Sequence, residues 1–126
     1  MIKILMAGLG GFFGAILRYV LSTFIYKLLG TDFPYGTFVV NVLGCFLIGF
    51  FMGLVDAGVI ISPNLRILIA IGLLGGFTTF SSFSYETVEL LKAGAWLSAV
   101  ANVVYTLLNC LGATWFGEVL SRLITK

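Results

Sequence analysis

Four long apolar stretches, separated by short polar segments, dominate the pattern of the chain. They run over Ile4–Leu29, Gly36–Val55, Leu65–Leu91 and Ala95–Leu123, and each is long enough to cross a bilayer core of about 30 Å. The pattern predicts an all-α, polytopic membrane protein with a single transmembrane domain over residues 1–126. Since the apolar part of the first stretch is too long for a cleavable signal peptide, we expect it to be a membrane helix.

The third stretch contains a segment that is unusual for a membrane helix. The Gly75-Gly76 pair readily leaves helical geometry, and it is followed by five Ser or Thr hydroxyls and three phenylalanines before Glu86. Polar groups at this depth need a protein or water-filled surrounding. We therefore expect the third helix to be broken at Gly75–Thr79. Beyond the break, a hydroxyl track flanked by phenyl rings is predicted from Thr79, Ser82, Glu86, Phe80 and Phe83.

The other stretches also carry polar or small side chains on one face. Arg18 either faces a polar interior or extends its charge to an interface. Asn41 either forms an interhelical hydrogen bond or lines a polar passage. One face of the fourth stretch carries Ser98, Asn102, Tyr105, Asn109 and Gly112. The convergence of such faces predicts a shared polar interior and favours a pathway.

Two glycine pairs have the spacing that lets membrane helices approach closely. They are Gly10-x-x-x-Gly14 in the first stretch and Gly49-x-x-x-Gly53 in the second. Both pairs predict tight contacts between helices.

Composition narrows the function. The chain is 60% hydrophobic and 10% charged, against about 25% charged in soluble domains. A net charge of +2 with scattered basic residues gives no support for nucleic-acid binding. Histidine is absent, and no nucleophile–base pair, metal cluster or phosphate loop is present, so an enzyme is not expected. Cys45 and Cys110 lie within apolar stretches, where buried free thiols are favoured over a disulfide.

Charge predicts only a weak preference for one orientation. Four helices place both termini on one side, with the second loop, and that side carries Lys3, Arg66, Arg122 and Lys126. The other two loops carry Lys27 and Lys92. So small a bias permits insertion in both orientations. Because four short helices cannot easily surround an aqueous path, we expect an oligomer, and two copies could pair antiparallel.

The polar groups suit a small anion better than a cation. A dehydrated anion needs hydrogen-bond donors of moderate strength, without one strong cation that would trap it. Ser, Thr, Asn and Tyr are such donors, and phenyl edges carry partial positive charge. A cation path would be expected to carry rings of carboxylates, whereas only Glu86 lies near the track.

Three motifs resemble those of the Fluc, or CrcB, fluoride channels, in order and over essentially the whole chain. They are Gly-Gly-x-x-Gly-Ala-x-x-Arg-Tyr at 10–19, Gly-Thr-x-x-x-Asn-x-x-Gly at 36–44 and Gly-Gly-Phe-Thr-Thr-Phe-Ser-Ser-Phe-Ser-x-Glu at 75–86. The third motif is the most specific. The chain departs from the family pattern at Asn109, where serine is common.

The resemblance implies a passive, fluoride-selective channel of the inner (plasma) membrane that lets cells shed toxic fluoride. It implies an antiparallel, dual-topology homodimer with two pores, with a central sodium ion held by backbone carbonyls of Gly75 and Thr78 from both subunits. A helix break would free such carbonyls, and the lack of a carboxylate there favours a monovalent ion. The implied ion pathway comprises Asn41, Phe80, Phe83, Thr79, Ser82, Glu86, Tyr105 and Asn109, with Arg18 in a vestibule.

Two other functions compete with this interpretation. A small proton-coupled multidrug-type exporter would need a carboxylate deep in the membrane, whereas Glu86 and Glu89 lie toward the end of the third stretch. A scaffold subunit would need only packing glycines and would have no use for the hydroxyl-phenyl track.

Overall fold

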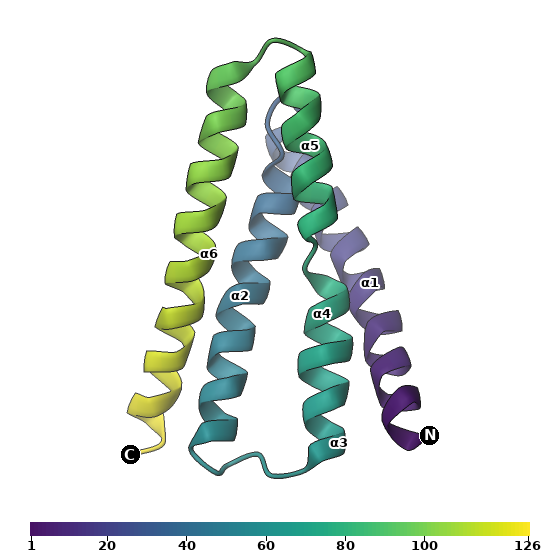
Figure 1. The fold of residues 1–126 in the computed structure, drawn as a ribbon, viewed down its shortest axis with the longest axis vertical. Coiled ribbons are helices and arrows are strands. Elements are labelled where there is room, and N and C mark those ends of the chain that lie inside the picture. The colour runs from purple at the N-terminus through teal and green to yellow at the C-terminus, as the bar shows by residue number, and fades with distance from the viewer.

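The computed structural model describes residues 1–126 and is entirely helical (Figure 1). Its elements are α1 (Ile2–Leu29), α2 (Tyr35–Asp56), α3 (Pro63–Arg66), the π-helical stretch η1 (Ile67–Leu74), α4 (Gly75–Phe77), α5 (Phe80–Lys92) and α6 (Trp96–Ile124). Four helical spans, one of them the composite Pro63–Lys92, are long and apolar enough to cross a membrane. The prediction of an all-α chain with four membrane helices is confirmed.

The third span begins with a capped turn and then changes helical type. The Ser62 hydroxyl accepts a hydrogen bond from the Leu65 amide, and Pro63 occupies the first helical position. This is the arrangement expected at a helix start, since proline lacks an amide that would go unpaired there. The following residues 67–74 are π-helical, a geometry often found at functional sites.

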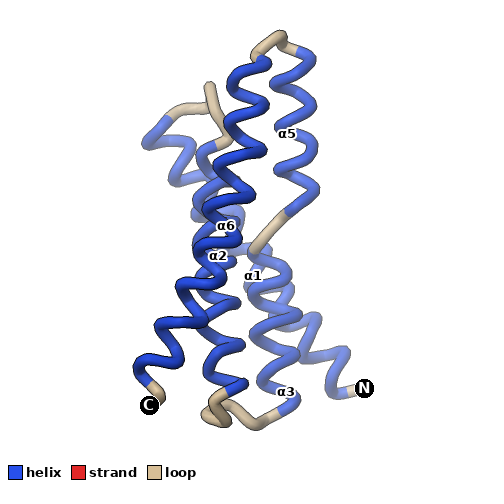
Figure 2. The backbone as a smooth tube through the Cα atoms, turned by 60° about the vertical axis from the view of Figure 1, so that its left-hand side comes forward, coloured by secondary structure: helices blue, strands red, loops and turns tan.

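The interruption lies at the C-terminal end of the predicted range Gly75–Thr79 and not at the glycine pair. Gly75 has helical backbone angles (φ −63°, ψ −37°) and Gly75–Phe77 form α4. Only Thr78 (φ −81°, ψ 158°) and Thr79 (φ −151°, ψ 114°) are extended, which appears as a short non-helical segment at mid-height in Figure 2. The conformational freedom of the glycine pair is therefore not what ends the helix. Hydrogen bonds around Thr79, described below, determine the position.

Both glycine pairs lie where helix backbones touch, as their spacing predicts. A Cβ atom at Gly10 or Gly14 would overlap backbone oxygens of η1, those of Leu68 and Leu73. In α2, a Cβ at Gly49 would overlap the Thr114 carbonyl oxygen of α6, and one at Gly53 would overlap the Ser121 hydroxyl. The glycines thus join α1 to the third span and α2 to α6.

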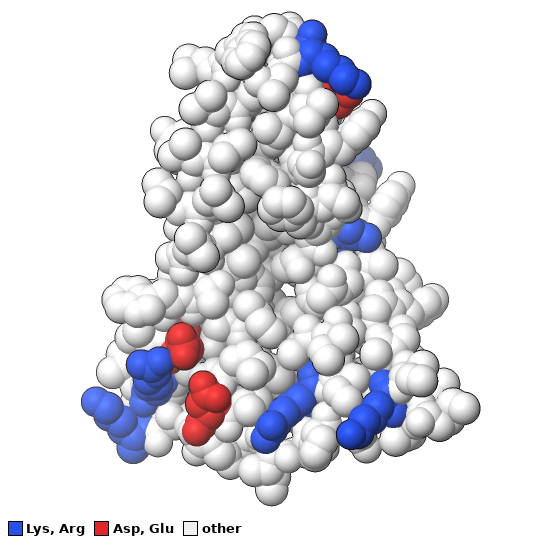
Figure 3. Space-filling model, in the orientation of Figure 1, with Lys and Arg blue, Asp and Glu red and all other residues white.

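The two termini lie at the same end of the bundle, together with the connection between α2 and α3 (Figure 1). The connections α1–α2 and α5–α6 lie at the opposite end. Basic groups gather mostly at the end with the termini, and much of the visible face between the two ends is uncharged (Figure 3). Such a surface suits a bilayer.

Candidate functional site

The interruption in the third span is held by Asn41 of α2. The Asn41 amide nitrogen donates to the Thr79 carbonyl oxygen at 2.9 Å, and the Thr79 amide donates to Asn41 Oδ1 at 2.8 Å. Both side chains are buried. Of the two roles considered for Asn41, the structure shows the interhelical hydrogen bond, here to a backbone, and it also places the residue at a cavity wall.

Thr79 also starts the next helix. Its hydroxyl accepts a hydrogen bond from the Ser82 amide at 3.1 Å and donates one to the Ser82 hydroxyl at 3.1 Å. A threonine in extended conformation whose hydroxyl accepts from the third helical residue is a favoured N-cap. The local sequence Thr79-Phe-Ser-Ser82 therefore restarts the helix, while Asn41 satisfies the backbone that the interruption exposes.

Two backbone carbonyls lose their helical partners at the interruption. In a continuous helix the Thr79 amide would bond the Gly75 carbonyl, but it bonds Asn41 instead. The Ser82 amide would bond the Thr78 carbonyl, but it bonds the Thr79 hydroxyl. The Thr78 carbonyl accepts no hydrogen bond within the chain. Carbonyl oxygens of this kind are the ligands that hard cations prefer.

A polar cavity of about 300 Å³ lies between α1, α2 and α5, on one side of Thr79. It brings together four of the predicted residues, Arg18, Thr79, Ser82 and Glu86. Its other lining residues are Ala15, Tyr19, Ser22, Tyr26, Thr37 and Val40. Arg18 therefore faces a polar cavity, which agrees with the first of the two roles considered for it.

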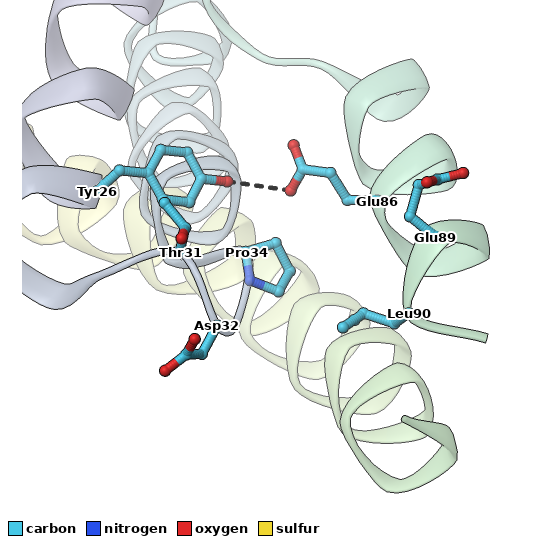
Figure 4. Close-up of a pocket in the computed structure, with 7 residues that line it drawn as sticks. All are labelled: Tyr26, Thr31, Asp32, Pro34, Glu86, Glu89 and Leu90. Carbon is cyan, nitrogen blue, oxygen red and sulfur yellow. Dashed lines mark hydrogen bonds between the residues drawn. The ribbon is translucent and has the colours of Figure 1, made fainter. Parts of the chain in front are cut away.

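Glu86 is held at the end of this cavity by two hydroxyl donors. Thr37 Oγ1 donates to one carboxylate oxygen at 2.7 Å. The Tyr26 hydroxyl donates to the other at 3.0 Å, the bond that is drawn in Figure 4. Tyr26 was not among the predicted site residues. It could have been found from its spacing, because Arg18, Ser22 and Tyr26 follow one another at intervals of four residues on one helix face.

A second cavity of about 210 Å³ lies on the other side of Thr79, between α2, α5 and α6. Its lining residues are Asn41, Cys45, Thr78, Thr79, Phe80, Phe83, Thr106, Leu107 and Cys110. The rings of Phe80 and Phe83 lie 5.4 Å apart between centroids and are tilted by 56°. Phe83 is 7% exposed, whereas Phe80 is 74% exposed in the single chain. Phe80 therefore presents its ring to whatever lies outside the subunit.

The structure does not bring Tyr105 and Asn109 to either cavity. Tyr105 is 58% exposed, and Asn109 is exposed and donates to the Tyr105 carbonyl at 2.8 Å. On the same helix, Asn102 is only 1% exposed and donates to the Thr87 hydroxyl at 2.8 Å. The expected polar face of the fourth span therefore divides. Asn102 packs against α5, whereas Asn109 and Gly112 line a separate, mostly apolar hollow between α2 and α6.

The site is suited to guiding an ion through a membrane. Hydroxyl and guanidinium donors lie on one side of Thr79, and the phenyl rings lie on the other with the Asn41 amide. No group of three or more metal-ligating side chains is present. The fold and this site define a multi-pass helical membrane protein with polar groups in its interior. The chain belongs to the CrcB family, because the pattern described as "CrcB-like protein, Camphor Resistance (CrcB)" matches residues 5–118.

Several relatives share almost their whole length with the chain. A protein of Citrifermentans bemidjiense is 49% identical over 112 residues, which are 89% of this chain and 90% of the relative. One of Geotalea daltonii is 46% identical over 121 residues, or 96% and 98% of the two chains. One of Shewanella putrefaciens is 47% identical over 118 residues, 94% of each. All three are named fluoride-specific ion channel FluC. The family resemblance drawn from the three motifs is confirmed.

Proposed function

We infer that this chain is a passive, fluoride-selective ion channel that exports toxic fluoride across the inner (plasma) membrane of the cell. The observation that carries the inference is the name fluoride-specific ion channel on relatives that are 46–49% identical over nearly the whole chain. An ion channel is not an enzyme, which agrees with the lack of a catalytic group in the sequence. No observation favours the proton-coupled exporter.

The interior supports an anion path by its chemistry. Fluoride that leaves water needs donors along its way, and each must be weak enough to let the ion go. The hydroxyls of Thr79 and Ser82 border the polar cavity, and the edges of Phe80 and Phe83 border the other. Because ring edges carry partial positive charge, they can solvate a small anion without a fixed full charge. Arg18 would attract the anion at the polar end.

Anion efflux from liposomes tests the function. Liposomes that contain the purified protein are expected to lose fluoride rapidly and to retain chloride. A potassium ionophore is added so that potassium flow balances the charge of the departing anion. No proton gradient should be needed. The passive channel would be contradicted if liposomes with well-folded protein retained their fluoride, or if fluoride efflux required a proton gradient.

Replacing Phe80 or Phe83 by isoleucine is expected to slow fluoride efflux by roughly three- to tenfold. The change removes an aromatic edge, and aromatic interactions of this kind contribute about 0.5–1.5 kcal/mol. Phe51→Ile, the same change at a buried ring that borders neither cavity, is the matched control and should leave the efflux rate close to that of the parent. Unchanged efflux in both cavity variants would remove the phenyl edges from the pathway.

We also propose that the active unit is an antiparallel, dual-topology homodimer with two pores. Three features of the single chain support it. Phe80 is largely uncovered, Gly75 is exposed, and Thr78 carries a carbonyl without a hydrogen-bond partner. A two-fold axis near these groups would cover Phe80. It would also bring together carbonyls of Gly75 and Thr78 from both copies. Those carbonyls fit a sodium ion, which would join the subunits structurally rather than take part in conduction.

Gly75→Leu is expected to dissociate the dimer while leaving each subunit folded. A Cβ at Gly75 would meet only the Ala70 carbonyl oxygen, at an ordinary 3.6 Å, so the subunit itself can accept a side chain there. Cross-linking and sedimentation in detergent measure the dimer, and circular dichroism measures the helices. Gly8→Leu, also exposed and with nothing within 4 Å of the new atom, is the control. A stable Gly75→Leu dimer would contradict an ion site at this position.

A further inference from the structure

The two cysteines of the chain come together beside the phenyl rings. Cys45 lies on α2 and Cys110 on α6, and both are free and half-buried. They are the only cysteines in the sequence. Both line the 210 Å³ cavity that also contains Phe80 and Phe83.

Backbone packing holds the two helices close together at this point. One turn beyond Cys45, Gly49 lies so near α6 that a Cβ atom would overlap the Thr114 carbonyl oxygen. Thr114 in turn lies one turn beyond Cys110, and Gly117 makes the same kind of contact with Phe46. The same register, one turn earlier on both helices, places positions 45 and 110 opposite each other across this tight interface.

We propose that Cys45 and Cys110 form a binding site for one soft, thiophilic metal ion, and that the bound ion closes the pathway past Phe80 and Phe83. The closure rests on the proposed channel function, whereas the metal site stands on the geometry of the two thiols. The relatives' name, fluoride-specific ion channel, implies no metal site of this kind.

The donor set selects the kind of metal. Thiolates prefer soft ions, and each thiol must lose its proton on binding. A divalent ion M²⁺ and two thiols therefore give one S–M–S unit and two released protons, with no change of oxidation state. Zinc requires four ligands in a closed site, and no group of three or more Cys, His, Asp or Glu side chains exists here. Ions that accept two ligands, such as Hg²⁺ or the monovalent ions of copper and silver, fit better.

A metal ion at this position would interfere with an anion in two ways. It would occupy part of a cavity of only about 210 Å³. It would also place a strong cation beside a path whose donors are otherwise of moderate strength. Conduction requires that each site release the ion as well as accept it. A fixed soft cation next to Phe80 and Phe83 is therefore expected to block fluoride rather than assist it.

Binding is tested first, without any measurement of flux, on reduced full-length protein in detergent with Hg²⁺ as the probe. The parent should bind one Hg²⁺ per chain with loss of both free thiols. Cys45→Ser and Cys110→Ser each keep one thiol. Removing Hg²⁺ from the parent should require a concentration of competing monothiol about 100-fold higher than removing it from either variant, because the second thiolate of the parent binds the metal intramolecularly. Equal resistance in parent and variants, or two Hg²⁺ per parent chain, would overturn the two-thiolate site.

Flux is then measured with and without one equivalent of Hg²⁺, each protein being compared with its own untreated rate. Fluoride efflux through the parent is expected to fall at least tenfold and to return when a small dithiol removes the metal. The double variant Cys45→Ser/Cys110→Ser should show no response to the metal. Undiminished efflux through a parent carrying one Hg²⁺ per chain would overturn the closure. An absence of efflux from untreated parent protein would instead contradict the channel function and leave the binding result intact.

Discussion

Asn41→Leu is expected to destabilise the protein by about 2–6 kcal/mol and to lower fluoride efflux more than tenfold. Leucine has a similar shape but cannot hydrogen-bond, so the Thr79 amide and carbonyl would both be left unpaired in a buried position. Each unpaired buried group costs about 1–3 kcal/mol. The chain between α4 and α5 would then rearrange, and the donors that border both cavities would move. Denaturant unfolding in detergent and liposome efflux measure the two effects.

Asn109→Leu is the matched control for this change. Asn109 is also a membrane-span asparagine, but it is exposed and donates only to the Tyr105 carbonyl one turn earlier. Its replacement should change the unfolding free energy by less than about 1 kcal/mol, the scale of a single net hydrogen bond. If Asn41→Leu were as mild as Asn109→Leu, the asparagine would not be what holds the interruption.

Gly49→Ala is expected to show the second largest effect, a loss of stability of about 1–3 kcal/mol or more. The added methyl group would overlap the Thr114 carbonyl oxygen of α6, and a backbone oxygen cannot turn aside as a flexible side chain does. Overpacking of this kind typically costs about 1–3 kcal/mol. The two helices would have to separate along their whole contact. Thermal unfolding in detergent measures the loss.

Gly112→Ala provides the comparison, because a Cβ at Gly112 would meet nothing within 4 Å. Since alanine is the better helix former by about 1 kcal/mol, this variant should equal or exceed the stability of the parent. A loss of stability in Gly49→Ala together with a gain in Gly112→Ala would confirm that the loss comes from the helix contact and not from replacing a glycine. A neutral Gly49→Ala would mean that α2 and α6 pack less tightly than the structure shows.

The four membrane spans could be predicted because length and apolar character alone decide them. The interruption could be predicted only as lying within Gly75–Thr79, and the residues of that range that leave the helix could not. Gly75 and Gly76 are the residues most able to leave a helix, yet they are helical in the structure. Thr79 leaves the helix because Asn41 lies opposite, and that partnership joins residues 38 positions apart. Sequence propensity describes each residue alone and therefore cannot predict the contact between Asn41 and Thr79.

Site residues could be predicted where they lie on one helix, because helical spacing shows which of them share a face. Thr79, the N-cap of α5, shares one sector with Ser82 and Glu86, and the structure places all three at one cavity. Spacing does not say which face of α6 turns inward, and so Tyr105 and Asn109 shared a predicted face with the buried Asn102 although they are exposed. The pairing of Glu86 with Tyr26 was missed because it joins the first and third spans.

The contact between Asn41 and Thr79 has a consequence for how this protein varies in evolution. The asparagine binds the backbone of residue 79, not its side chain. Any residue except proline presents the same amide and carbonyl at 79, so most changes there require no compensating change at 41. Positions in contact usually reveal themselves by varying together. These two would vary independently, and the contact would stay invisible to methods that infer proximity from correlated substitutions.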